Sequence, residues 1–98
     1  MSNEKDYLEI LEKYQDIKEI SDLKDDVKKL REYYHSGQYD KMQQHIQSLM
    51  LKYLAETVVW NSSHTVAPQT PEQCYQNAEA FLYSKFQALV VKGGLSSK

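Results

Sequence analysis

Residues that interrupt helices are scarce in this chain. Its 98 residues include three glycines and two prolines, and two of the glycines are adjacent near the C-terminus. Sheets with many turns need more of both residue types, whereas long helices need few of them. A chain of this length is expected to form one domain around one core. We therefore predict a single all-α domain, a small helical bundle that spans residues 1–98.

Two helices are expected in the first part of the chain, where apolar residues recur at three- and four-residue steps and mark a buried face. The first helix is predicted over residues 4–20. Ser21 can cap a second helix over residues 22–36, because serine accepts a hydrogen bond from the first free N–H groups. The pair Ser36-Gly37 then ends it. If the break at Ser21 were false, residues 3–35 would form one helix, and the sequence leaves both alternatives open.

Two further helices are expected in the second part of the chain. A continuous apolar stripe predicts the third helix over residues 38–60. Thr70 and Gln73 have the spacing of a capping box, and a proline stands between them at the first helical position. This pattern predicts that the fourth helix begins here and spans residues 71–91, before a loose tail over residues 93–98. The bundle is therefore predicted to have four helices.

The predicted lengths suggest how the helices pack. The third and fourth helices are about 35 and 32 Å long, and the link between them allows a long antiparallel hairpin. The first two helices are about 10 Å shorter. The tight Ser36-Gly37 turn keeps the second helix beside the start of the third, so the far end of the hairpin is left uncovered. The apolar residues expected at that end are Leu54, Val58, Val59, Trp60, Val66 and Tyr75.

We interpret these six residues as a contact surface centred on Trp60, for a protein partner or for a second copy of the chain. Exposed apolar patches with an aromatic anchor tend to be contact sites. In the alternative interpretation, the loop that contains Val66 folds back and buries Trp60 in the core.

Cys74 raises the question of catalysis, because it follows a strong helix-start pattern. A helix N-terminus can activate a thiol, but Cys74 is already the fourth residue of the predicted helix. Its spacing from Ala78 and Phe81 favours a contact with the core. No histidine has a His or Cys partner three or four residues away, and a single cysteine excludes a cysteine-based zinc site. We expect no enzyme activity, cofactor or metal, and keep as an alternative a small enzyme or redox or metal protein that uses Cys74 and a histidine.

Net charge and hydropathy bear on two further classes of function, nucleic-acid binding and membrane insertion. A net charge of −2 gives no reason to expect nucleic acid, so a nucleic-acid-associated accessory factor is kept only as a further alternative. The chain has no apolar stretch of the roughly 20 residues that cross a membrane, and its charged N-terminus lacks the apolar segment of a signal peptide. We expect a small acidic, cytoplasmic protein without membrane contact. The predicted function is non-catalytic protein–protein interaction, as in adaptors, inhibitors, immunity-type proteins or chaperones.

Overall fold

The computed structural model describes the backbone of residues 3–63 and 70–93 and the side chains of residues 7–62 and 70–89. The predicted all-α class is confirmed, since the described residues form helices and contain no strand. The predicted number of four helices is wrong. The five helices are α1 (Asn3–Lys13), α2 (Lys18–His35), α3 (Tyr39–Lys52), α4 (Leu54–Ser63) and α5 (Pro71–Gly93).

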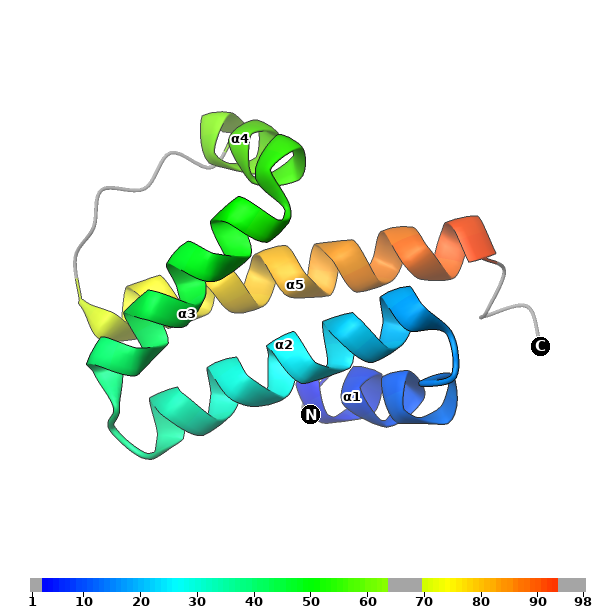
Figure 1. Cartoon of the computed structure of the whole chain (residues 1–98), viewed down its shortest axis with the longest axis horizontal. Coiled ribbons are helices and arrows are strands. Elements are labelled where there is room, and N and C mark those ends of the chain that lie inside the picture. Colours follow the sequence, from blue (N-terminus) through cyan, green and yellow to red (C-terminus); the bar gives the residue numbers. More distant parts are fainter. Residues whose placement is uncertain (1–2, 64–69, 94–98) are drawn as a thin grey trace.

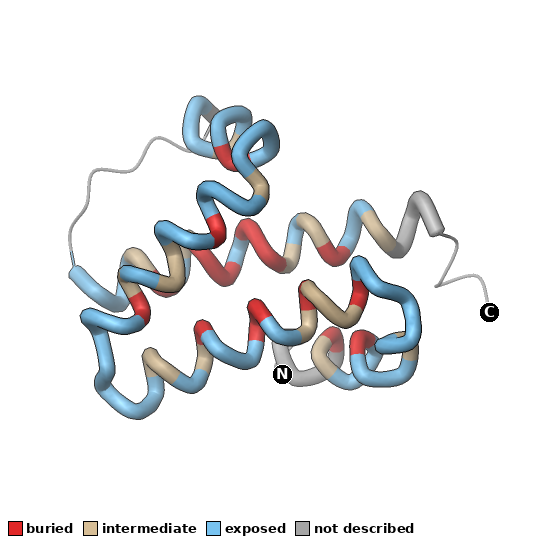
Figure 2. Tube along the Cα trace, viewed as in Figure 1, coloured by how far each residue is buried: buried red, intermediate tan, exposed pale blue. Residues whose placement is uncertain are grey.

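Helix α2 lies at the centre of the fold and contacts α1, α3 and α5 (Figure 1). Helices α2 and α5 run in opposite directions, α1 lies beside the first half of α2, and α4 lies across the end of α3. The buried faces of α2, α3 and α5 point toward one another, and exposed residues cover the outside (Figure 2). The buried apolar side chains are Tyr7, Leu11, Ile20, Leu23, Val27, Leu30, Met42, Leu49, Tyr75, Ala78, Phe81, Leu82 and Phe86.

The first two helices are separate, but the predicted break at Ser21 is wrong. The chain turns over residues 14–17, and α2 begins after Ile17 without a capping hydrogen bond from that side chain. The earlier turn places Ile20 on the buried stripe of α2 that continues with Leu23. Burial of an apolar side chain contributes about 1.5–3 kcal/mol, whereas a serine cap contributes about 1 kcal/mol. Burial therefore outweighs the local capping signal.

The end of α2 follows the predicted stop at Ser36-Gly37. Gly37 has a φ of 76°, a left-handed conformation that glycine adopts without a steric cost. The Gly37 N–H donates to the carbonyl of Tyr34 at 3.1 Å, and the Gln38 N–H donates to that of Tyr33 at 2.9 Å. These two bonds form a Schellman motif, which satisfies carbonyls that the helix end would otherwise leave free.

The start of α5 has the capping box that the sequence predicts. The Thr70 Oγ1 accepts a hydrogen bond from the Gln73 N–H at 3.1 Å. In return, the Gln73 Oε1 accepts one from the Thr70 N–H at 3.2 Å. Pro71 is the first residue of the helix, where its missing N–H has no consequence. The local sequence alone therefore determines where this helix begins.

The predicted third helix over residues 38–60 is broken at Tyr53, which separates α3 from α4. The Met50 carbonyl would accept the Leu54 N–H in an unbroken helix. In the structure the buried Thr57 hydroxyl lies 3.1 Å from the Met50 carbonyl oxygen and 3.1 Å from that of Leu54, so its one proton is shared between these two acceptors. The backbone can therefore leave the helical path here without an unpaired carbonyl at Met50.

The predicted antiparallel hairpin between the third and fourth helices is wrong. Helices α3 and α5 begin at the same end of the molecule and diverge from there (Figure 1). Aromatic contacts define this end: the Tyr75 ring near the start of α5 stacks on Tyr34 with centroids 4.0 Å apart, and Tyr39 of α3 lies 6.0 Å from Tyr34. The break at Tyr53 turns α4 away from the direction of α3, so residues 38–60 do not form the single long helix that the hairpin requires.

Candidate functional site

A group of large apolar side chains is exposed around the junction of α3 and α4. Leu51, Val58 and Val59 are 74%, 59% and 65% exposed, and Leu54 is also more than half exposed. Met50 completes the group at 41%. We call these five residues the α4 surface. Large exposed apolar patches on single globular chains tend to mark contact sites.

A groove of about 490 Å³ lies beside the α4 surface, between α4 and α5. Val59 belongs to both features. The Glu56 carboxylate and the Lys85 ammonium form an ion pair across the groove at 3.0 Å. The groove therefore has an apolar lining whose two charges offset each other. Its lining residues are Ala55, Glu56, Val59, Trp60, Phe81, Ser84, Lys85 and Ala88.

Trp60 is half-buried and attaches α4 to α5. Its indole N–H donates to the Asn77 Oδ1 at 3.2 Å, and its ring meets the Phe81 ring edge to face at 5.8 Å. These contacts place Trp60 against the core, where it forms part of the groove wall. Trp60 therefore lies between the core and the α4 surface and holds α4 in place. The more exposed side chains are its neighbours on α4.

The structure brings together four of the six residues predicted for the contact surface: Leu54, Val58, Val59 and Trp60 all lie on α4. Tyr75 does not join them. It is buried, and its ring stacks on Tyr34 at the end of α2. Val66 lies outside the described residues.

Sequence reasoning missed two members of the α4 surface, Met50 and Leu51. The stretch from Leu49 to Trp60 has apolar residues facing most directions, a pattern that indicates burial on several sides. The structure buries Leu49 but leaves Leu51 on the outside. An all-round apolar pattern cannot distinguish a helix that is enclosed from one that has an exposed apolar face.

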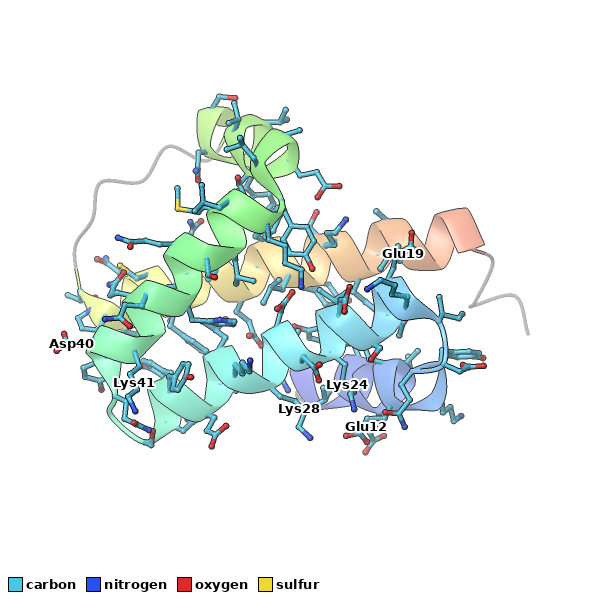
Figure 3. All side chains as sticks on the ribbon, in the orientation of Figure 1. Glu12, Glu19, Lys24, Lys28, Asp40 and Lys41 are labelled. Atoms are coloured by element: carbon cyan, nitrogen blue, oxygen red, sulfur yellow. The ribbon has the colours of Figure 1, made fainter. Side chains whose placement is uncertain are left out.

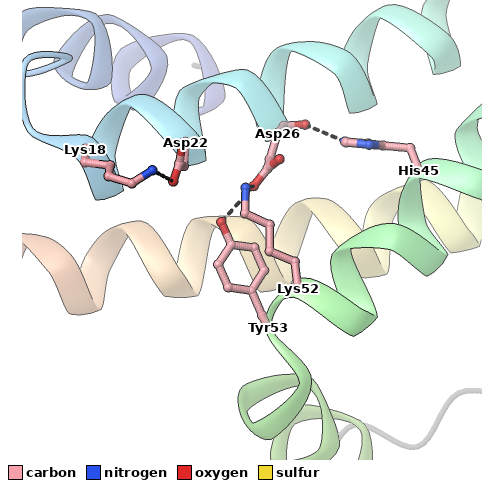
Figure 4. Close-up of polar contacts among 6 residues, drawn as sticks. All are labelled: Lys18, Asp22, Asp26, His45, Lys52 and Tyr53. Atoms are coloured by element: carbon pink, nitrogen blue, oxygen red, sulfur yellow. Dashed lines mark hydrogen bonds and ion pairs between the residues drawn. The ribbon is translucent and has the colours of Figure 1, made fainter.

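The orientation of the α4 surface depends on Asp26, a buried carboxylate of α2 (Figure 4). Its Oδ2 accepts a hydrogen bond from the Tyr53 hydroxyl at 2.7 Å and lies 3.1 Å from the Lys52 Nζ. Lys52 is the last residue of α3, and Tyr53 is the residue between α3 and α4. Burial, followed by the hydrogen bond to Asp26, raises the pKa of Tyr53 above its usual range. The sequence carries no local signal for this contact, because the partners are separated by 26 and 27 residues.

Cys74 is half-buried and packs against the core. The spacing of Glu32 and His35 matches a metal-binding Glu-x-x-His pair. Within residues 3–63 and 70–93, however, no three His, Cys, Asp or Glu side chains come together as a metal site would require. None of the described helices has the length and apolar character needed to cross a membrane.

In comparisons with protein-family models, curated proteins and solved structures, none matched this chain.

Proposed function

We propose that this chain acts without catalysis, as a small protein–protein interaction module whose contact is the α4 surface. One observation carries the proposal. Eight large apolar side chains are exposed in the described part of the chain, and five of them lie between residues 50 and 59. Burial of such side chains at a contact contributes about 25 cal/mol for each Å² of apolar area removed from water. A cluster of them is therefore a stronger candidate for a contact than the same residues scattered singly.

The occupant that we propose for this surface is a second copy of the chain. Leu54, Val58 and Val59 are exposed on one helix, α4, and Val59 also lines the groove between α4 and α5. A two-fold axis near Val58 can place α4 of one copy against α4 of the other, which is an isologous contact. Lys85 already pairs with Glu56, so identical copies would not meet like charges there.

Light scattering on wild type and on Val58→Asp tests this proposal. A wild-type chain has a mass of 11.5 kDa, and we expect twice that value at concentrations of tens of micromolar, which is typical for a dimer with a micromolar Kd. Val58→Asp should reduce the mass to that of one chain while the helical circular dichroism signal stays unchanged. Trp60 is unsuitable for this test, because its contacts with Asn77 and Phe81 make any change there destabilising.

The matched control is Ile17→Asp, which also places a carboxylate on an exposed apolar position. Ile17 is the N-cap residue of α2, and aspartate is favourable at that position, so the fold should be retained. This variant should keep the dimer. A wild type that stays at the mass of one chain over the whole range would overturn the second copy as the occupant. The α4 surface would then bind a different protein. In that case Val58→Asp should abolish the binding of that protein.

A further inference from the structure

A second hollow, of about 340 Å³, lies between α2 and α3. It is separate from the α4 surface and has a different chemistry. Every side chain that lines it carries a hydrogen-bond donor, and none is a carboxylate. Lys29 and Tyr33 come from α2, one helical turn apart, and the others come from one face of α3. The lining residues are Lys29, Tyr33, Lys41, Gln44, His45 and Ser48.

The two lysines of this hollow have no ion pair among the described side chains. Lys52 and Lys85, by comparison, pair with Asp26 and Glu56. Asp40 is the sequence neighbour of Lys41, but the two side chains leave the first turn of α3 in different directions (Figure 3). Two lysines that form no ion pair with a described side chain therefore share one hollow in a chain whose net charge is negative.

His45 is held in place at the wall of the hollow. Its Nε2 lies 3.1 Å from the main-chain carbonyl oxygen of Asp26 (Figure 4). A carbonyl oxygen only accepts, so this nitrogen carries the proton. The His45 ring also meets the Tyr33 ring edge to face, with centroids 6.0 Å apart. These contacts form an aromatic wall beside the two lysines.

We propose that this hollow binds the phosphoryl group of a small phosphomonoester. At neutral pH such a group carries a charge of about −1.5 to −2 and presents several strong acceptor oxygens. Hydrogen bonds from charged donors to such oxygens are among the stronger ones, and Lys29 and Lys41 supply two of these donors. Ser48 and Gln44 supply neutral donors. The volume exceeds what a phosphoryl group alone requires, so the Tyr33–His45 wall is available to the organic part of the ligand.

An NMR titration of the amide signals tests this site, with inorganic phosphate and adenosine monophosphate as separate probes at a fixed ionic strength. The amide signals of residues 29–33 and 41–48 should shift together along one binding curve. We expect a Kd on the order of 1 mM for inorganic phosphate. Adenosine monophosphate should bind at least about threefold more tightly if the aromatic wall takes part. Equal affinity of the two probes would overturn the assignment of the wall to the organic part.

The double variant Lys29→Gln/Lys41→Gln should weaken binding of both probes at least about tenfold. Both lysines are exposed, so the variant should fold, which circular dichroism verifies. The matched control is Lys13→Gln/Lys28→Gln, which removes the same two charges from exposed positions outside the hollow. It should bind with nearly wild-type affinity. An equal loss in both double variants, or the lack of any saturating shift in the wild type, would overturn the site.

Discussion

The Arg31 guanidinium donates two hydrogen bonds to one oxygen of the Glu79 carboxylate, from Nε at 3.0 Å and from Nη2 at 2.8 Å. Both side chains are largely buried, and they join α2 to α5 across 48 residues of sequence. Arg31 also lies over the Tyr7 ring, 5.2 Å from its centroid, which brings α1 into the same cluster. One ion pair therefore connects three of the five helices.

We predict that Glu79→Ala lowers the free energy of unfolding by about 3 kcal/mol, because it leaves the Arg31 charge in a mostly buried place without this carboxylate. Urea unfolding followed by circular dichroism measures the change. Glu56→Ala is the matched control: it removes the carboxylate of an ion pair whose Glu56 side chain is 52% exposed. In the Glu56→Ala variant the free energy of unfolding should fall by less than about 1 kcal/mol, because exposed ion pairs contribute little to stability. Equal losses in the two variants would contradict the special role of the Arg31–Glu79 pair.

We predict that Thr57→Val destabilises the fold by about 1–2 kcal/mol, although valine is the more apolar residue and Thr57 is buried. The Thr57 hydroxyl lies 3.1 Å from the carbonyl oxygens of Met50 and Leu54, and the change leaves the Met50 carbonyl without this donor at the helix break. Thermal or urea unfolding of the wild type and the variant shows whether the change lowers or raises the stability. A gain in stability would show that burial of a methyl group outweighs the hydrogen bond.

We predict that stability declines as the pH rises above about 10, where tyrosines of the unfolded chain lose their protons. Burial, and then the negative charge of Glu79, raises the pKa of Tyr7. Burial, and then the hydrogen bond to Asp26, raises that of Tyr53. The folded chain therefore keeps protons that the unfolded chain releases. The stability from both residues is present below about pH 10 and is lost above it, by about 1.4 kcal/mol per pH unit for each tyrosine.

Urea unfolding at several pH values between 8 and about 12 measures this slope. The double variant Tyr7→Phe/Tyr53→Phe should show a shallower decline than the wild type, whatever its stability at neutral pH. If the variant declined as steeply as the wild type, these two hydroxyls would not be the groups responsible.

The exposed apolar residues of the α4 surface were partly predictable, for a reason that concerns α4 alone. Leu54, Val58 and Val59 stand out in the sequence as apolar residues with no obvious cover, and the structure leaves all three exposed. An antiparallel hairpin would bring the start of α5, and Tyr75 with it, to the end of α4. In the structure Tyr75 packs against Tyr34 instead, since α3 and α5 start at the same end.

The sequence by itself determined the all-α class and those helix ends that depend on neighbouring residues. The stop at Gly37 and the start at Thr70 and Gln73 are formed by hydrogen bonds that span five residues or fewer, so the residues present are sufficient to predict them. Only the tertiary structure decided the break at Tyr53. Its partner Asp26 lies 27 residues away, and neither glycine nor proline marks the position. The hydrogen bonds from Tyr53 to Asp26 and from Thr57 to Met50 are buried only when the chain is packed. Together they set the direction of α4 and of its exposed apolar face.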